Sequence, residues 1–402
     1  MNNILKTLLL GLLSAILFSA FIYFEAFGLT SKFVNTLFGL SALALLLYIP
    51  KHSILVAGFT IGLLWFYWIG YSFEYQDVGY MTPVVTIGFG FIYLLFFLPL
   101  YFTDKAYIRA LLLFGLSFFA PFNWNWLQIE LIFIESYIGV YKYQLITTLL
   151  ALSLPSLIKN KHYKYLPLTL LLFSINYGYP EQKSAPLKIK LVQTDIQQGN
   201  KWSREALPPT VKMIFKEIKI AEQKGYDLVV LPESVFPLYM NYHPEVITAL
   251  KRESQNIAIL VGALLREDNH SYNVSYLFQD GDFKIAKKLV LVPFGEYIPL
   301  PKFAQKFIND TFFKGASDFV TAERPTDFMI KGLKFRNAIC YEATCSEIYE
   351  GDVAFILAIS NNAWFAPSIE PTLQNLLLKY YARKNGVTIY HAANYKGSGV
   401  IK

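Results

Sequence analysis

The apolar composition of the amino-terminal part is the feature that most constrains the fold of this chain. Charged residues are sparse and apolar runs are long up to about Tyr179, whereas charges appear at ordinary density from Leu187 onward. Only 16% of the residues are charged, against roughly a quarter in soluble globular proteins. The polar segment 180–186, with a proline at each end, separates the two parts. We therefore predict a transmembrane domain over residues 1–180 and a water-soluble domain over residues 187–402.

The amino-terminal part contains about seven apolar segments, each close to the roughly 20 residues that a helix needs to cross a bilayer. The first, from about Leu5 to Leu29, is too long for the apolar core of a signal peptide, and no small-residue cleavage site follows it. The stretch 122–140 carries Glu130 and Glu135, which would be costly in a lipid-facing helix, so we expect an interfacial or re-entrant element there. The predicted spans lie near residues 6–28, 31–50, 52–73, 82–103, 106–121, 141–158 and 163–179.

The basic residues of the short loops predict the orientation in the membrane. With a cytoplasmic amino terminus, the predicted inner loops hold most of the lysines and arginines, as expected for cytoplasmic loops. An odd number of spans then places the soluble domain on the outer face. The net charge of +7 arises largely in the inner loops, so we expect no nucleic-acid partner, and the remaining charge suits a surface near anionic headgroups. The basic residues predicted inside are Lys6, Lys51, Lys105, Arg109, Lys159, Lys161 and Lys164; those predicted outside are Lys32 and Lys142.

The water-soluble part alternates strand-like and helix-like segments, which predicts an α/β layered fold with mixed sheets. The wholly apolar run 228–231 is typical of a central strand, and Asp280-Gly281 is a hairpin turn signal. No glycine-rich nucleotide-binding run is present and the five histidines are scattered, so we expect neither a nucleotide cofactor nor a metal site. We expect strands at 187–193, 228–231, 257–262, 274–278, 283–286, 335–340, 353–359 and 387–392, and helices at 203–224, 245–256 and 371–385.

Polar residues at the ends of apolar runs are candidate catalytic groups. Cys340 ends a short apolar stretch, which is where α/β folds present a nucleophile. Glu233 follows an apolar run and a proline, and partial desolvation there would raise its pKa and make it a general base. Lys288 precedes an apolar run, so its ammonium can stabilise the oxyanion of a tetrahedral intermediate. Glu296 follows a turn that would bring its carboxylate back to orient the lysine or carry a proton.

Each of these residues also has a plainer interpretation. A lone cysteine such as Cys340 is commonly a packed small residue, and a lysine such as Lys288, next to Lys287, is commonly solvated. Glu233 alone would suit the first turn of a helix. The agreement of three motifs, each joining a polar group to the end of an apolar run, favours an active site.

The order of these motifs resembles the apolipoprotein N-acyltransferase family of the nitrilase (carbon–nitrogen hydrolase) superfamily. The run 232–234 (Pro-Glu-Ser) is a weak signal alone. The runs 292–297 (Val-Pro-Phe-Gly-Glu-Tyr) and 339–342 (Ile-Cys-Tyr-Glu), in this order after a membrane domain, are specific. The resemblance also includes 192–198 and 360–365, and so extends through nearly the whole chain.

The resemblance implies an αββα sandwich that faces the periplasm from a multi-pass domain in the bacterial inner membrane. It implies that Glu233 is the general base, Lys288 the oxyanion stabiliser and Cys340 the nucleophile, with no cofactor. Matching supporting positions are Glu296, Trp202, Tyr341 and Glu342, and Trp364 matches a mobile-arm or pocket position.

The family's reaction has two halves. The resemblance implies that Cys340 takes an acyl chain from a phospholipid and holds it as a thioester. The α-amino group of a diacylglyceryl-cysteine apolipoprotein then attacks this thioester. A site at the bilayer surface suits a lipid donor of this kind.

Two departures from the family pattern bear on this interpretation. The chain stops at Lys402, where family members continue with further strands and a last transmembrane helix, so we expect the catalytic domain to be short at its carboxyl end. A second thiol, Cys345, follows the nucleophile and is expected to be a packed residue. Two other functions remain open: a membrane-tethered amidase, in which water replaces the amine, and an inactive truncated membrane scaffold.

Overall fold

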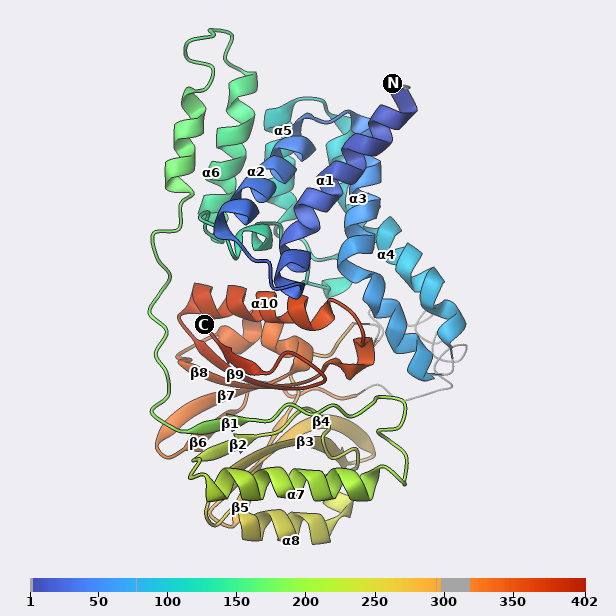
Figure 1. The fold of residues 1–402 in the computed structure, drawn as a ribbon, viewed down its shortest axis with the longest axis vertical. Coiled ribbons are helices and arrows are strands. Elements are labelled where there is room, and N and C mark those ends of the chain that lie inside the picture. The colour runs from blue at the N-terminus through green and yellow to red at the C-terminus, as the bar shows by residue number, and fades with distance from the viewer. Residues whose placement is uncertain (1–2, 77, 294, 298–318) are drawn as a thin grey trace. The chain divides into compact units, whose positions relative to one another are not determined.

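The computed structural model describes residues 3–76, 78–293, 295–297 and 319–402 (Figure 1). The chain divides into two compact units, Met1–Tyr179 and Pro180–Lys402. Phe294, part of the motif at 292–297, lies outside the described residues.

The first unit is helical and apolar. Among its described residues, three helical stretches are long and apolar enough to cross a membrane: Asn3–Ala26, Lys51–Tyr75 and Gly79–Phe102. Shorter apolar helices cover Lys32–Tyr48 and Ala106–Leu116. The number of membrane crossings stays a prediction. The α-helices are α1 (Asn3–Ala26), α2 (Lys32–Tyr48), α3 (Lys51–Phe66), α4 (Thr82–Phe97), α5 (Ala106–Leu116) and α6 (Lys142–Ser153).

Helices α3 and α4 approach closely because α3 carries small residues on one face. A Cβ atom at Gly62 would lie 2.4 Å from the carbonyl oxygen of Phe89, and one at Gly58 would lie 2.9 Å from that of Tyr93. Glycines four residues apart allow the backbones of two apolar helices to pack against each other.

The stretch 122–140 forms no α-helix. It contains the short 3₁₀ helix Ile129–Phe133, whose residues are all buried within the first unit. Glu130, which is fully buried, lies 2.8 Å from the ammonium of Lys142. The buried carboxylate is therefore paired, as a charge in an apolar environment requires.

The second unit contains two five-stranded sheets. In the first, in the order β1-β2-β3-β4-β5, the three leading strands are parallel and β3, β4 and β5 are antiparallel. In the second, in the order β10-β9-β8-β7-β6, the three central strands are parallel and both edge strands antiparallel. The strands are β1 (Ile189–Leu191), β2 (Leu228–Val230), β3 (Ala258–Glu267), β4 (His270–Gln279), β5 (Asp282–Lys287), β6 (Asp327–Ile330), β7 (Leu333–Ile339), β8 (Phe355–Asn361), β9 (Thr388–Asn394) and β10 (Gly399–Ile401).

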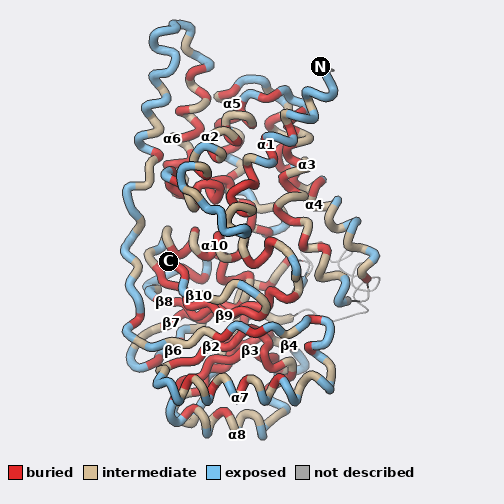
Figure 2. The backbone as a smooth tube through the Cα atoms, in the orientation of Figure 1, coloured by how far each residue is buried: buried red, intermediate tan, exposed pale blue. Residues whose placement is uncertain are grey.

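The burial pattern shows that these two sheets are the inner layers of an αββα sandwich. Leu228 packs in one apolar cluster with Leu357 of the other sheet, whereas its neighbour Val229 packs with Ile214 of α7, because successive residues of a strand face opposite sides. Figure 1 shows α7 and α8 along the first sheet and α10 along the second, and Figure 2 shows the central strands as the most buried part. The helices are α7 (Leu207–Gln223), α8 (Pro244–Glu253) and α10 (Glu370–Asn385).

The α/β class and the αββα layers predicted for the soluble part are confirmed. The hairpin predicted at Asp280-Gly281 joins β4 to β5, with φ of 53° and 78° at these two residues, as a two-residue turn of this kind requires. The helix expected at 203–224 begins later, at Leu207.

Candidate active site

Cys340 is the first residue after strand β7. It opens the 3₁₀ helix η9 (Cys340–Thr344) with a φ of 56°, in the left-handed region that non-glycine residues rarely adopt. Such a conformation costs about 1–3 kcal/mol and is typical of functional sites. Cys340 is partly exposed, whereas Cys345 is buried, and neither forms a disulfide.

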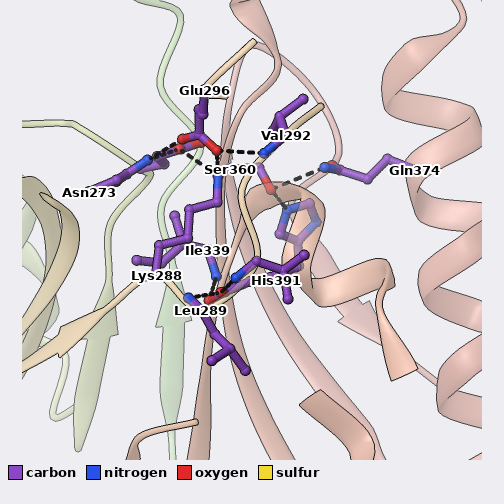
Figure 3. Close-up of polar contacts among 12 residues, drawn as sticks. Asn273, Lys288, Leu289, Val292, Glu296, Ile339, Ser360, Gln374 and His391 are labelled. Atoms are coloured by element: carbon purple, nitrogen blue, oxygen red, sulfur yellow. Dashed lines mark hydrogen bonds and ion pairs between the residues drawn. The ribbon is translucent and has the colours of Figure 1, made fainter. Parts of the chain in front are cut away.

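Lys288 lies between two carboxylates. Its Nζ lies 2.7 Å from Glu296 Oε2 (Figure 3). The same Nζ lies 3.9 Å from Glu233 Oε1, and the lysine side chain is 1% exposed. Asn273, on β4, donates through Nδ2 to Glu233 Oε1 at 2.7 Å and to Glu296 Oε1 at 3.1 Å. One ammonium and one amide thus hold two buried carboxylates in fixed positions, which is the pairing that buried charges require.

Glu233 reaches this cluster because its loop crosses directly over β3. The loop follows β2, and Ser234 has a φ of 45°. A Cβ atom at Gly262 would lie 2.5 Å from the main-chain nitrogen of Ser234 and 2.7 Å from the Cα of Glu233. Only glycine at 262 allows the backbone of the Glu233 loop to lie this close to the strand.

Glu342 connects the Lys288 segment to the turn that holds Cys340. Its Oε2 accepts hydrogen bonds from the main-chain nitrogens of Leu289 at 2.6 Å and Val290 at 3.2 Å, and its Oε1 accepts one from Ile339 at 2.6 Å. Burial raises the pKa of Glu342 to about 7, although the charge of Lys288 and these N–H donors act in the opposite direction. The carboxyl group therefore fixes the relative positions of two candidate catalytic segments.

The surroundings of the site raise both the pKa of the thiol and that of the lysine, which disfavours the thiolate and favours the ammonium. Burial raises the pKa of Cys340 well above its ordinary value, Glu233 adds to the rise, and Lys288 opposes it. Burial lowers the pKa of Lys288, but the negative charges of Glu296, Glu233 and Cys340 outweigh burial, so that its pKa is raised. The lysine is a fixed cation, and the thiol has to give its proton to a neighbouring base before it can act as a nucleophile.

The remaining sequence-predicted positions differ in burial and in their neighbours. Tyr341 is buried beside Cys340, in η9. Trp202 is 48% exposed, and among the described residues no hydrogen bond or ion pair joins it to the carboxylates. Trp364 lies in the 3₁₀ helix η11 (Asn362–Phe365), next to Asn361. With the Asn361 amide turned to suit its neighbours, its oxygen accepts from Trp364 Nε1 at 3.2 Å.

Lys201 is a functional candidate that sequence reasoning missed. It is 1% exposed, and its Nζ donates to the main-chain carbonyl of Glu233 at 3.2 Å. Burial lowers its pKa to about 8, although Glu233 opposes this shift. The neighbouring Trp202 attracted attention in the sequence, but nothing there distinguishes a buried lysine from a solvated one. Asn273, Gly262 and the buried carboxyl Glu370 were missed in the same way.

A neutral polar network lies on the second sheet and on α10 (Figure 3). His391 Nε2 lies 2.8 Å from Ser360 Oγ and its Nδ1 lies 2.9 Å from the carbonyl oxygen of Gly397. Gln374 Nε2 donates to the same serine at 3.3 Å. Burial lowers the pKa of His391 to about 4, so the ring is neutral, Nδ1–H donates to Gly397, and Nε2 accepts from Ser360. All three side chains are buried, and none of them carries a charge.

The site consists of a thiol, an ammonium and carboxylates, which suits acyl transfer through a covalent thioester. Within the part of the chain that the structure describes, no group of three or more His, Cys, Asp or Glu residues is placed to hold a metal ion.

Comparisons with protein families identify the class of each unit. Residues 188–399 match the family model described as carbon-nitrogen hydrolase. Residues 5–177 match the model described as the apolipoprotein N-acyltransferase integral membrane domain. The chain is therefore a membrane protein with a hydrolase-type α/β unit.

Relatives of similar length define the family more closely. The chain is 44% identical to the apolipoprotein N-acyltransferase of Wolinella succinogenes over 98% of this chain and 96% of that protein. It is 37% identical to that of Helicobacter pylori, over 94% of this chain and 90% of that protein. It is 38% identical to the apolipoprotein N-acyltransferase of Helicobacter hepaticus, over 92% of this chain and 94% of that protein. The chain belongs to the apolipoprotein N-acyltransferase family.

Proposed function

We propose that this chain N-acylates lipoproteins by moving an acyl chain from a phospholipid to the N-terminal amine of a diacylglyceryl-cysteine apolipoprotein, through a thioester on Cys340. The observation that carries the proposal is the buried ion pairing of Lys288 with Glu233 and Glu296. The charges of these three groups act on the Cys340 thiol. Membership of the family supports lipoprotein N-acylation as the overall reaction.

In the first half-reaction, Glu233 takes the proton of the Cys340 thiol, and the thiolate attacks the ester carbonyl of the phospholipid. The oxygen of the tetrahedral intermediate gains a negative charge that the fixed ammonium of Lys288 stabilises. The C–O bond to the glycerol then breaks, and the proton on Glu233 passes to the departing oxygen. A lysophospholipid leaves, and the acyl group remains on sulfur.

In the second half-reaction, the free α-amine attacks the thioester carbonyl. Lys288 again stabilises the tetrahedral oxyanion, and Glu233 takes a proton from the amine nitrogen. The C–S bond breaks, and the proton passes from Glu233 to the sulfur of Cys340. Throughout both halves Glu296 is a positioning residue, because it holds the lysine at 2.7 Å.

Intact-protein mass spectrometry after incubation with phospholipid vesicles tests the thioester. We expect an acyl-sized mass increase that hydroxylamine removes, and no increase in Cys340→Ala. Cys345→Ala is the matched control, because its thiol is buried and outside the proposed chemistry. No adduct on the folded wild-type protein would contradict the proposal. An adduct that water removes as fast as the apolipoprotein amine does would favour an amidase.

We also propose that the chain resides in the bacterial inner membrane with about seven crossings, and that residues 187–402 face the periplasm. Labelling of intact cells with a membrane-impermeant maleimide tests this, in a Cys340→Ser background. Lys284→Cys, at an exposed position of β5, should be labelled, and Lys105→Cys, at an exposed position before α5, should not. The reverse pattern would invert the topology.

A further inference from the structure

Glu370 is a buried carboxyl group that the proposed mechanism does not use. It is the first residue of α10 and is 1% exposed. Among the described residues its Oε2 has no hydrogen-bond partner. Because burying a carboxyl group without a partner is costly, such a group in a folded protein calls for a ligand or a catalytic explanation.

Glu370 opens α10, and this helix packs against η9, the short helix that Cys340 opens. The negative charge of Glu370 acts on the Cys340 thiol, and that of Glu233 acts on both groups, so these charges disfavour ionisation of the thiol and of the Glu370 carboxyl. Burial, together with Glu233, raises the pKa of Glu370 well above its ordinary value. The other charged groups that act on the same thiol are Lys288 and Glu296. Lys288 is already paired with Glu296. A cation that binds Glu370 would therefore supply the partner that its Oε2 lacks among the described residues.

The acceptor of the proposed reaction supplies such a cation. An α-amino group has a pKa of about 7.7–8.0, so much of it arrives as ammonium. An ammonium cannot attack a thioester until it has lost a proton. A partly desolvated carboxyl group next to the sulfur is suited both to binding the ammonium and to removing that proton.

We infer that Glu370 receives the α-ammonium of the acceptor and takes one proton from it, so that a free amine faces the thioester on Cys340. As the ammonium binds, the Glu370 proton leaves to solvent and a carboxylate–ammonium pair forms. One ammonium proton then moves to Glu370, and the free amine forms the C–N bond. A second nitrogen proton passes through Glu233 to the departing sulfur. Each turnover releases one proton to solvent. This inference rests on the proposed acyl transfer.

Separate measurement of the two half-reactions tests Glu370→Gln, which keeps the shape of the side chain and removes its acidity. We expect thioester formation from phospholipid at close to the wild-type rate. We expect attack by a diacylglyceryl-cysteinyl peptide on the preformed thioester to be at least about tenfold slower near neutral pH. The deficit should shrink at alkaline pH, where the peptide arrives as free amine, and Glu370→Asp should restore part of the rate.

The matched control is Glu350→Gln, which removes an exposed carboxylate of the same unit and should leave both half-reactions unchanged. Equal slowing of both half-reactions by Glu370→Gln, or an unchanged pH profile for amine attack, would overturn the inference.

A second measurement requires no acyl transfer. Alkylation of Cys340 by iodoacetamide should be slowed by hexylamine in the wild-type protein but much less in Glu370→Gln, with hexanol as the uncharged control. If no thioester forms but this protection depends on Glu370, the proposed function fails and the amine site stands. Equal protection in both proteins would overturn the amine site.

Discussion

Two buried polar clusters of the second unit differ in how completely they are paired. In the network around His391, the ring has a partner at each nitrogen and carries no charge. In the cluster around Lys288, one ammonium faces two carboxylates, and a third carboxyl, Glu370, has a free oxygen among the described residues. The neutral cluster is therefore fully paired, whereas the charged cluster, which we propose to be the active site, is not.

The backbone differs in the same way. Cys340 and Ser234, which flank the charged cluster, both have positive φ values, whereas His391 and Ser360 lie in regular strands. Strain and incomplete pairing persist only where the surrounding structure enforces them, and together they are better indicators of an active site than burial alone. Variants in each cluster should therefore affect different properties.

Replacing the central cation should have the largest effect. In Lys288→Met the two carboxylates lose their counter-ion, so we expect acyl transfer to fall by about 10²–10³ or more and the free energy of unfolding to fall by about 3–5 kcal/mol. Lys287→Met is the control, since its ammonium pairs with Glu267 at the surface. Thermal unfolding and single-turnover rates check both. Retained acyl transfer in Lys288→Met would remove the lysine from the mechanism.

Gly262→Ala should displace Glu233 without touching a catalytic side chain. The added Cβ would meet the loop backbone at 2.5–2.8 Å, so the loop has to shift. We expect about a 10²-fold lower rate of thioester formation and a loss of about 1–3 kcal/mol of stability. Gly399→Ala, where a Cβ meets nothing within 4 Å, should change neither. A stability loss with a normal rate would show that the position of Glu233 is not critical.

Asn273→Ala removes the amide that bridges Glu233 and Glu296. We expect the free energy of unfolding to fall by about 1–3 kcal/mol, because buried acceptors lose their donor, and the rate of thioester formation to fall by about tenfold. Asn256→Ala, which breaks an exposed amide–carboxylate bond to Glu222, serves as control and should lie near wild type. Similar behaviour of the two variants would contradict a bridging role for Asn273.

The neutral network should control the acid stability and leave the chemistry unchanged. The pKa of His391 is about 4 in the folded state, against about 6.5 when unfolded. The unfolded state binds more protons between these values, so stability should fall as pH drops from about 6.5 to 4, by roughly 3 kcal/mol at most.

His391→Gln should remove this dependence, and the difference between the two melting curves isolates the histidine. The subtraction is needed because the pKa of Glu342 is raised to about 7. That carboxyl contributes stability below its ordinary pKa and loses it as pH rises through 7. Parallel melting curves at all pH values would show that His391 is not the titrating group.

The sequence predicted the strand ends and the residues that follow them. Glu233, Lys288 and Glu296 are brought together, and Glu233 follows β2 as expected. Lys288 was expected to precede a strand at 289–292, but residues 289–292 form no strand, and the lysine instead follows β5 directly. The position of Glu233 was predictable because an apolar run that ends in a polar residue is a local signal. The catalytic roles of these residues remain a proposal.

The supporting residues were not predictable from local signals. Asn273 lies inside a strand, and its partners are 40 and 23 residues away along the chain. In the sequence, Gly262 looks like an ordinary strand residue, and only the structure shows the Glu233 loop crossing it. Glu370 looks like a helix-capping residue, because it is the first residue of α10. Such roles depend on which strands pair and which layers stack, and the sequence pattern leaves this open.

The three hydrogen bonds that the Glu342 carboxylate accepts from main-chain N–H groups have a consequence for how the chain can evolve. Replacing this one carboxyl would leave three main-chain donors, on segments about 50 residues apart, without an acceptor at once. A shorter or uncharged side chain cannot accept the hydrogen bonds of both segments. Substitutions of Glu342 are therefore not neutral. A homologue without this carboxyl group would need compensating changes in both the loop after Lys288 and the turn at Cys340.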